Sequence, residues 1–124
     1  MKTKIMIIED SYTNRVLFTA LLEELDIEVI ACSNALRALK MMETTVPDII
    51  LLDICMPIMT GFEFLQELRQ SYPALPVIVI SALDDSAHIE QAYAMGANEY
   101  LVKPVSSELL IRRLSSYIEC ELTY

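Results

Sequence analysis

The sequence predicts an α/β protein of one domain, with a parallel β-sheet and helices on both of its faces. Short apolar runs of four or five residues alternate with longer segments of helical period, which is the pattern of repeated strand–helix units. The central runs Ile49–Leu52 and Val77–Ile80 are apolar at every position, as in strands that are covered on both faces. A chain of 124 residues has the length of a single domain with a substantial core.

The first half of the chain is expected to hold two strand–helix units. The apolar run Lys4–Ile8 predicts a strand, and the helical period of Thr13–Leu25 predicts the helix that follows. The apolar face of this helix is expected to consist of Val16, Leu17, Ala20, Leu21 and Leu25. The second strand, Glu28–Ala31, is less uniformly apolar, so we expect it at an edge of the sheet, followed by a helix at Ala35–Glu43.

The second half of the chain is expected to hold three further units. The strands are predicted at Ile49–Leu52, Val77–Ile80 and Glu99–Val102, and the helices at Phe62–Ser71, Ala87–Met95 and Ser107–Glu119. Pro47, Pro73 and Pro76 mark entries into strands, because proline ends a preceding helix. Gly61 and Gly96 stand at a helix start and a helix end, where backbone freedom is useful. The last helix is expected to bury Leu110, Ile111, Leu114 and Ile118.

The composition narrows the classes of function. With 54% hydrophobic and 22% charged residues the chain is expected to fold compactly, and it carries no signal-peptide or membrane-helix pattern, so we expect a soluble, cytoplasmic protein. The net charge of −9 argues against direct nucleic-acid binding and favours a metal cation or a basic partner. Cys32, Cys55 and Cys120 form no CxxC pair and are expected to be reduced thiols.

Polar side chains follow four of the predicted strands. Glu9 and Asp10 come after the first, Asp53 after the third, Ser81 after the fourth and Lys103 after the fifth. In a parallel sheet these positions meet at one edge, which is where open α/β sheets bind their ligands. Each residue alone has a common structural role, such as a helix-start acid, a helix cap or a solvated lysine. Their joint occurrence at four strand ends favours a functional site.

The residue types at this edge indicate phosphoryl chemistry with a metal ion. Three clustered carboxylates resist ionisation unless a cation is present, and Mg²⁺ is commonly held by one or two carboxylates with water and phosphate oxygens. Asp53 could take a phosphoryl group as an acyl phosphate. Lys103 would offer a positive charge to a phosphoryl oxygen, and Ser81 a hydroxyl donor to another.

From Lys4 through the last helix the sequence resembles the receiver domain of two-component response regulators. The residues that carry the resemblance are Ile8-Glu9-Asp10, Pro47–Pro57 with Gly61, Ser81-Ala82, and Gly96–Pro104. The resemblance implies one receiver domain over residues 1–124 with a flavodoxin-like, doubly wound (βα)5 sheet in strand order 2-1-3-4-5. It also implies a phospho-acceptor in a phosphorelay, which catalyses only its own phosphoryl transfer and dephosphorylation.

Carried over by position, the resemblance assigns a role to each polar residue. Asp53 would be phosphorylated, and Mg²⁺ would be held by Asp10 and Asp53 directly, by Glu9 through water and by the backbone carbonyl of Cys55. Ser81 and Lys103 would contact the phosphoryl group, and a cis peptide bond before Pro104 would point Lys103 into the site. Tyr100 would turn inward when the hydroxyl of Ser81 moves toward the phosphoryl group.

The resemblance also implies partners. The phosphoryl donor would be a sensor histidine kinase or a phosphotransfer protein, and the switch would alter the surface formed by Ala87–Met95, Glu99–Val102 and the final helix. An effector protein or domain would read that surface, without direct contact to nucleic acid or membrane. A dimer, a single-domain regulator and a receiver within a longer protein all fit this pattern.

Three other functions fit the sequence less well than a receiver. A phosphatase of the haloacid dehalogenase type needs a second aspartate two residues after the nucleophile, where Cys55 stands, and usually a cap domain. A nucleotide- or flavin-binding module would carry a glycine-rich loop after the first strand, but Glu9-Asp10 would repel a phosphate there. A degenerate receiver that works without phosphorylation conflicts with the complete acid, serine and lysine set.

Overall fold

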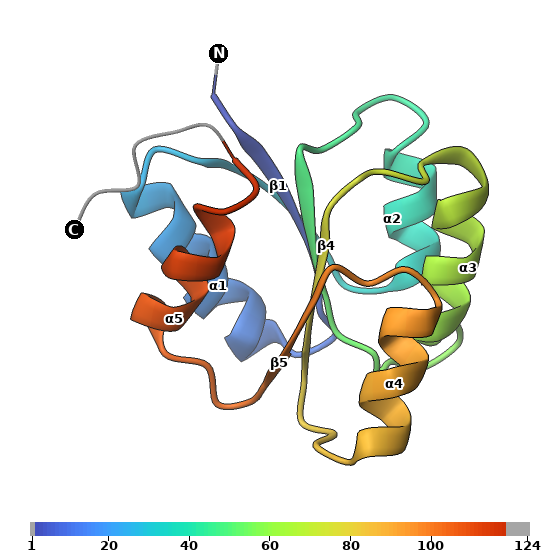
Figure 1. Ribbon diagram of the computed structural model, residues 1–124. Helices are drawn as coiled ribbons and strands as arrows, with labels where there is room; N and C mark the ends of the chain where they lie inside the picture. Colours follow the sequence, from blue (N-terminus) through green and yellow to red (C-terminus); the bar gives the residue numbers. More distant parts are fainter. Residues whose placement is uncertain (1, 119–124) are drawn as a thin grey trace.

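The computed structural model describes residues 2–118 and contains one parallel sheet with the strand order β2-β1-β3-β4-β5 (Figure 1). The elements are β1 (Lys4–Ile8), α1 (Tyr12–Glu24), β2 (Glu28–Cys32), α2 (Ala35–Met41), β3 (Ile49–Leu52), α3 (Gly61–Ser71), β4 (Val77–Ser81), α4 (Ser86–Ala94), β5 (Glu99–Val102) and α5 (Ser107–Leu114). The predicted fold class and strand order are confirmed. Within these residues no helix combines the length and the apolar character needed to cross a membrane.

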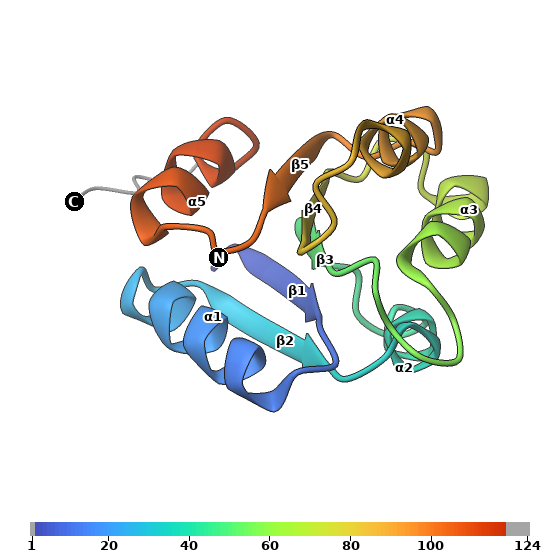
Figure 2. The same ribbon diagram turned by 90° about the horizontal axis from the view of Figure 1, so that it is seen from below.

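The helices cover both faces of the sheet and give each face its own core. α1 and α5 lie on one face, and α2, α3 and α4 on the other (Figures 1 and 2). Along β3, Ile49 and Leu51 belong to the core under α1 and α5, whereas Ile50 and Leu52 belong to the core under the other three helices. Because successive strand residues point to opposite faces, a strand covered on both sides must be apolar throughout.

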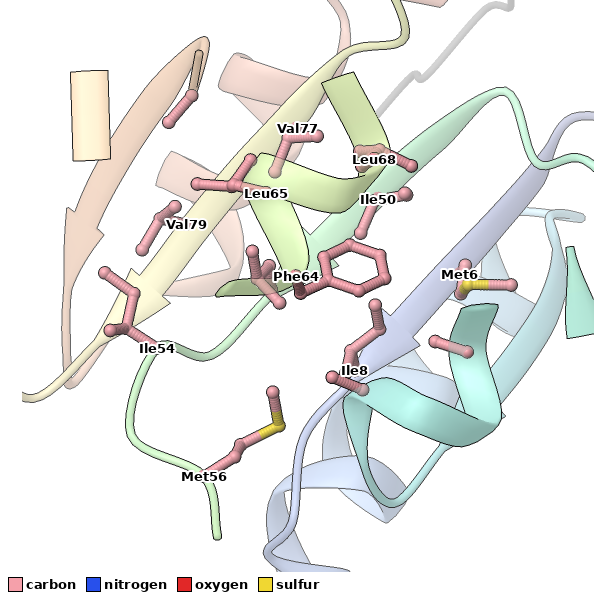
Figure 3. Close-up of a cluster of buried hydrophobic side chains, with 14 of the residues drawn as sticks. Met6, Ile8, Ile50, Ile54, Met56, Phe64, Leu65, Leu68, Val77 and Val79 are labelled. Atoms are coloured by element: carbon pink, nitrogen blue, oxygen red, sulfur yellow. The ribbon is translucent and has the colours of Figure 1, made fainter. Parts of the chain in front are cut away.

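The larger core lies under α2, α3 and α4. Figure 3 shows Phe64 of α3 at its centre, pointing onto the strands near Ile8 and Ile50, and all three side chains are fully buried. At this face the end of β3 leads directly into Ile54 and Met56, which are also buried. The loop after Asp53 is therefore anchored at two points by buried apolar side chains.

Capping residues set where the helices begin. The residues before the five helices, Ser11, Asn34, Thr60, Asp85 and Ser106, each accept a backbone N–H from the first helical turn. This moves the starts of α1, α3 and α4 one residue earlier than predicted. The helices α2 and α5 end earlier than predicted, at Met41 and Leu114, and the predicted end at Glu119 lies outside the described residues.

The predicted apolar face of α1 was only partly right, because Leu21 and Leu25 pack against the core but Val16 and Leu17 do not. Val16 and Leu17 are exposed, and the side that packs on the sheet carries Leu22 with Phe18 and Leu21. Residues turn by about 100° each around a helix, so Val16 points nearly opposite Phe18 and well away from Leu22. The residues that follow Phe18 at intervals of three and four positions are the ones that face the sheet.

Candidate functional site

The carboxyl ends of β1 and β3 bring two acids together. These strands are neighbours with Ile8 opposite Leu52, so the residues that follow, Glu9 and Asp53, lie side by side. The backbone N–H of Asp53 donates to the carbonyl of Ile8 at 3.0 Å, which continues the alignment past the last strand residue. The sheet register, rather than a flexible loop, therefore fixes the spacing of the two carboxyl groups.

A cluster of three carboxylates stands at this edge. Oxygens of Glu9, Asp10 and Asp53 lie within 4.8 Å of one another. Glu9 and Asp53 are only 3% and 6% exposed, whereas Asp10 is exposed. Hard divalent cations prefer oxygen ligands of this kind, and a cation would relieve the repulsion between the carboxylates. The three acids predicted from the sequence therefore form a group that could hold a metal ion.

Lys103 reaches this cluster from the other side. Ser81 pairs with Val102 in the sheet, so Lys103 directly follows the last paired residue of β5. Its Nζ lies 2.6 Å from Oε1 of Glu9 and 3.1 Å from Oδ2 of Asp53. The peptide bond between Lys103 and Pro104 is cis, as the family resemblance implies. One ammonium group thus partly neutralises two buried carboxylates.

Burial and charge shift the pKa values of these groups in different directions. Burial and the neighbouring carboxyl of Glu9 raise the pKa of Asp53 to about 6. Burial is the largest single influence on Glu9 and opposes its ionisation, but the hydrogen bonds with Lys103, Asp53 and the backbone of Ser11 together outweigh burial and lower the Glu9 pKa below its usual value. The same two carboxylates overcome the effect of burial on Lys103 and raise its pKa. Asp53 is therefore the acid of the pair that holds its proton more tightly.

Two residues of α1 that were not predicted to belong to the site, Asn14 and Arg15, support the acid pair. The side-chain amide of Asn14 donates to Oε1 of Glu9 at 3.1 Å, and the backbone N–H of Ser11 donates to Oε2 at 3.2 Å. Nη1 of Arg15 donates to the backbone carbonyls of Glu9 at 2.8 Å and Asp10 at 3.0 Å. The spacing of residues along the chain gives no signal for these contacts.

The loop after β3 shapes the site around Asp53. The backbone N–H of Cys55 donates to Oδ1 of Asp53 at 3.0 Å, and the exposed thiol is free, as is that of buried Cys32. Cys120 lies outside the described residues. A Cβ on Gly61 would lie 2.6 Å from Cα of Ile54 and 2.8 Å from the carbonyl oxygen of Asp53. Glycine is thus required for α3 to begin this close to the loop.

Ser81 and Tyr100 meet at the loop after β4 and not at the carboxylates. Oγ of Ser81, which is fully buried, accepts the backbone N–H of Leu83 at 3.2 Å. The hydroxyl of Tyr100 donates to the carbonyl of the same Leu83 at 2.7 Å. Both backbone groups of one loop residue are therefore held by the two predicted switch residues. The sequence pattern does not indicate that Leu83 links them.

Comparison with known proteins identifies the family. Residues 5–115 match the model of a family described as "Response regulator receiver domain". The chain belongs to this family. The chemotaxis protein CheY of Listeria monocytogenes is similar to this receiver, with 32% identity over 90% of the chain and 94% of the relative. The transcriptional regulatory protein PhoP of Bacillus subtilis is 30% identical over 95% of the receiver but only 49% of its own length.

Solved structures agree with this assignment. The chemotaxis protein CheY4 of Vibrio cholerae superimposes with a TM-score of 0.90 at 28% identity, covering 95% of the receiver and all of that chain. The receiver domain of the sensor histidine kinase PA1611 of Pseudomonas aeruginosa has a TM-score of 0.87 and 26% identity, over 97% of this receiver. That structure is described as having a magnesium ion coordinated in its active-site cleft.

Family membership sets the general function of this receiver. Receiver domains of two-component systems are phospho-acceptors in phosphorelay signalling and not classical enzymes. They interact with histidine kinases and with output domains or proteins. The relatives include a transcriptional regulator and a protein-glutamate methylesterase, so domains of this family are combined with different outputs.

Proposed function

We propose that Asp53 accepts a phosphoryl group from a phosphohistidine of a sensor histidine kinase or phosphotransfer protein. The observation that carries this proposal is the buried carboxylate at the end of β3, 3.1 Å from Nζ of Lys103. The carboxylate would attack phosphorus, the P–N bond to histidine would break, and an O–P bond to Asp53 would form. The released ring nitrogen would take up a proton, leaving a neutral histidine and an acyl phosphate.

Two further side chains of the receiver would contact the transferred group. Lys103 already lies between Asp53 and Glu9, and its ammonium group would offset charge on a phosphoryl oxygen. The hydroxyl of Ser81 would leave the N–H of Leu83 and donate to another phosphoryl oxygen. Water attacking phosphorus would later break the O–P bond and release inorganic phosphate, restoring the carboxylate of Asp53.

The donor set of the site fits Mg²⁺. Asp10 and Asp53 would bind it directly, Glu9 through water, and the backbone carbonyl of Cys55 would complete the protein ligands. This assignment is supported by the acidic cluster and by the magnesium ion described for the related receiver of PA1611. When bound, the metal ion offsets the charge that gathers on the transferring phosphoryl oxygens.

Movement of Ser81 would reach the surface through Leu83. If the Ser81 hydroxyl turns to the phosphoryl group, it releases the N–H of the residue whose carbonyl binds Tyr100. The backbone N–H of Tyr100 in turn donates to the hydroxyl of Tyr93 on α4 at 3.1 Å. The surface of α4, β5 and α5 is thus the proposed output, read by an effector or by a second receiver in a dimer. The extent of the domain over 1–124 and its cytoplasmic location stay predictions.

Phosphorylation with a small donor tests the acceptor. With Mg²⁺ and acetyl phosphate, intact mass spectrometry is expected to show one added phosphoryl group on the wild type and none on Asp53→Asn. Asp48→Asn is the matched control, because Asp48 precedes the same strand at the opposite edge of the sheet. An unmodified wild type, or equal labelling of Asp53→Asn, would exclude Asp53 as the acceptor.

A phosphoryl mimic tests the switch separately. Beryllium fluoride with Mg²⁺ is expected to shift the backbone amide resonances of Leu83, Tyr100 and the residues of α4 in the wild type. In Ser81→Ala the mimic should still bind at Asp53, but the shifts at Tyr100 and α4 should be lost. Ser71→Ala, at the exposed end of α3, should behave as wild type. Unchanged shifts in Ser81→Ala would sink the proposed route through Leu83.

A further inference from the structure

A second hollow, separate from the carboxylate cluster, lies beside the free edge of the sheet. It has a volume of about 610 Å³ and is lined by α1, the end of β2 and α2. Figure 2 shows β2 ending between α1 and α2. The size lies within the range of about 300–1,000 Å³ that is usual for small-molecule sites. Nothing in the phospho-acceptor reaction makes use of this hollow.

The lining of the hollow is basic in an acidic protein. Arg15, Arg37 and Lys40 line it together with a single acid, Glu43, although the whole chain has a net charge of −9. Among residues 2–118, no carboxylate oxygen lies within 4.0 Å of a side-chain nitrogen of Arg37 or Lys40. The nitrogen Nη1 of Arg15 is bonded to backbone carbonyls, which leave its charge in place. The hollow therefore presents more positive than negative charge.

Other groups in the lining suit an anion as well. Burial raises the pKa of the Cys32 thiol despite nearby Arg37, so the thiol adds no negative charge at neutral pH. The N–H of Glu28 donates to the carbonyl of Thr3, and the carbonyl of Cys32 accepts the N–H of Glu9, so both residues turn these groups toward the chain of β1. In a parallel ladder the alternate residue Ala31 then turns its backbone N–H away from β1, toward the free edge. A hydroxyl of Ser33 completes the donors along this wall.

We propose that this hollow binds a small anion with a diphosphate group. Two guanidinium groups and one ammonium group can share the charge of a diphosphate, and arginine presents paired donors that match phosphate oxygens. A nucleic-acid chain would meet the repulsion of the acidic surface around the hollow, whereas a small ligand does not. Arg15 also holds the backbone of Glu9 and Asp10, so a bound anion would contact a residue that supports the carboxylate cluster.

Titration of metal-free wild type in EDTA tests the site without any phosphodonor, and so independently of the proposed function. The probes are inorganic pyrophosphate, adenosine diphosphate and adenosine, followed by backbone amide NMR. Pyrophosphate is expected to shift the amides of Ala31, Ser33 and α2 saturably, with a Kd on the order of 0.1–1 mM. Adenosine should cause no shift. If adenosine diphosphate binds more tightly than pyrophosphate, the ligand is a nucleotide. If the two bind equally, the site recognises the diphosphate group alone.

Paired charge variants make the test specific. Arg37→Gln/Lys40→Gln is expected to weaken pyrophosphate at least about tenfold, because charge-assisted hydrogen bonds to the anion are lost. The matched control Arg112→Gln/Arg113→Gln removes the same charge from α5 and should leave the Kd unchanged. Equal weakening in both variants, or no saturable shift in wild type, would overturn the proposal. The proposal would also be overturned if a tetraglutamate peptide binds and pyrophosphate does not, because that result would indicate a site for an acidic peptide.

Discussion

Asp53 illustrates how burial and neighbouring charges compete in setting the pKa of a carboxyl group. Its carboxyl is 6% exposed and faces Glu9, so burial and a like charge favour the protonated form, while Lys103 favours the ionised one. The result is a pKa of about 6, high for an aspartate but low enough for ionisation near neutral pH. The same arrangement costs folding stability, because the ionised carboxylate would be better solvated in the unfolded chain.

The pH dependence of stability should reveal this cost. The folded state raises the pKa of Asp53, so the stabilising effect of its neutral form is complete below about pH 4 and is lost as the pH rises through about 6. Asp53→Asn does not titrate. In EDTA, the free energy of unfolding of wild type relative to Asp53→Asn should therefore fall by on the order of 2–3 kcal/mol between pH 4 and pH 7.5. Urea unfolding at both pH values measures the difference.

The control for this prediction is Asp48→Asn, because Asp48 is an exposed acid at the other end of β3. Its stability relative to wild type should stay nearly constant over the same pH range. A difference between wild type and Asp53→Asn that does not change with pH would show that the Asp53 carboxyl has an ordinary pKa.

At the scale of elements, the strands were easier to predict than the helix ends and faces. A strand covered on both faces is apolar at every position, so Ile49–Leu52 was recognisable without knowing its neighbours. The helix starts depended on capping side chains such as Thr60, whose box with Glu63 fixes the start of α3. The face of α1 was misjudged in part, because exposed Val16 and Leu17 are as apolar as the residues that pack on the core.

In the site, too, the residues at strand ends were easier to predict than the contacts made by helices and loops. Glu9, Asp53 and Lys103 could be placed together from the sequence because parallel strands end at one edge. The support of Glu9 by Asn14 and the link of Ser81 to Tyr100 through Leu83 depend on loop and helix geometry. Such contacts carry no signature in the spacing of residues along the chain.

Arg69 joins three elements at the edge opposite the site. Its guanidinium group donates to the carbonyls of Gly96 at 2.6 Å, Tyr72 at 2.7 Å and Leu75 at 2.7 Å, which ties α3 to the loops before β4 and β5. Arg69→Met should lower the free energy of unfolding by on the order of 3 kcal/mol, because carbonyls in a partly buried setting lose charged donors. Arg112→Met, an exposed arginine on α5, is the control and should change it little. Urea unfolding that shows equal effects would contradict this role.

For the whole molecule, charge is distributed unevenly over the fold. The chain has a net charge of −9, and three of its carboxylates form a cluster at the carboxyl ends of the strands. Basic residues gather instead in the hollow between α1 and α2. General repulsion among the acids is reduced by any salt, since the screening length shortens with ionic strength. The cluster of Glu9, Asp10 and Asp53 differs, because its oxygens are close enough to share one cation. Site binding and general screening should therefore be separable.

A comparison of MgCl2 with KCl at equal ionic strength separates the two effects. Both salts should stabilise the protein by screening, but Mg²⁺ should add the free energy of site binding, about 2.7 kcal/mol at a concentration 100-fold above its Kd. Thermal unfolding of wild type, Asp10→Asn and the control Asp48→Asn measures this increment. It should persist in Asp48→Asn and largely disappear in Asp10→Asn, whose exposed carboxylate belongs to the cluster. Coincident curves for the two salts in wild type would mean that the acids are only screened, and an unchanged increment in Asp10→Asn would mean that the ion binds elsewhere.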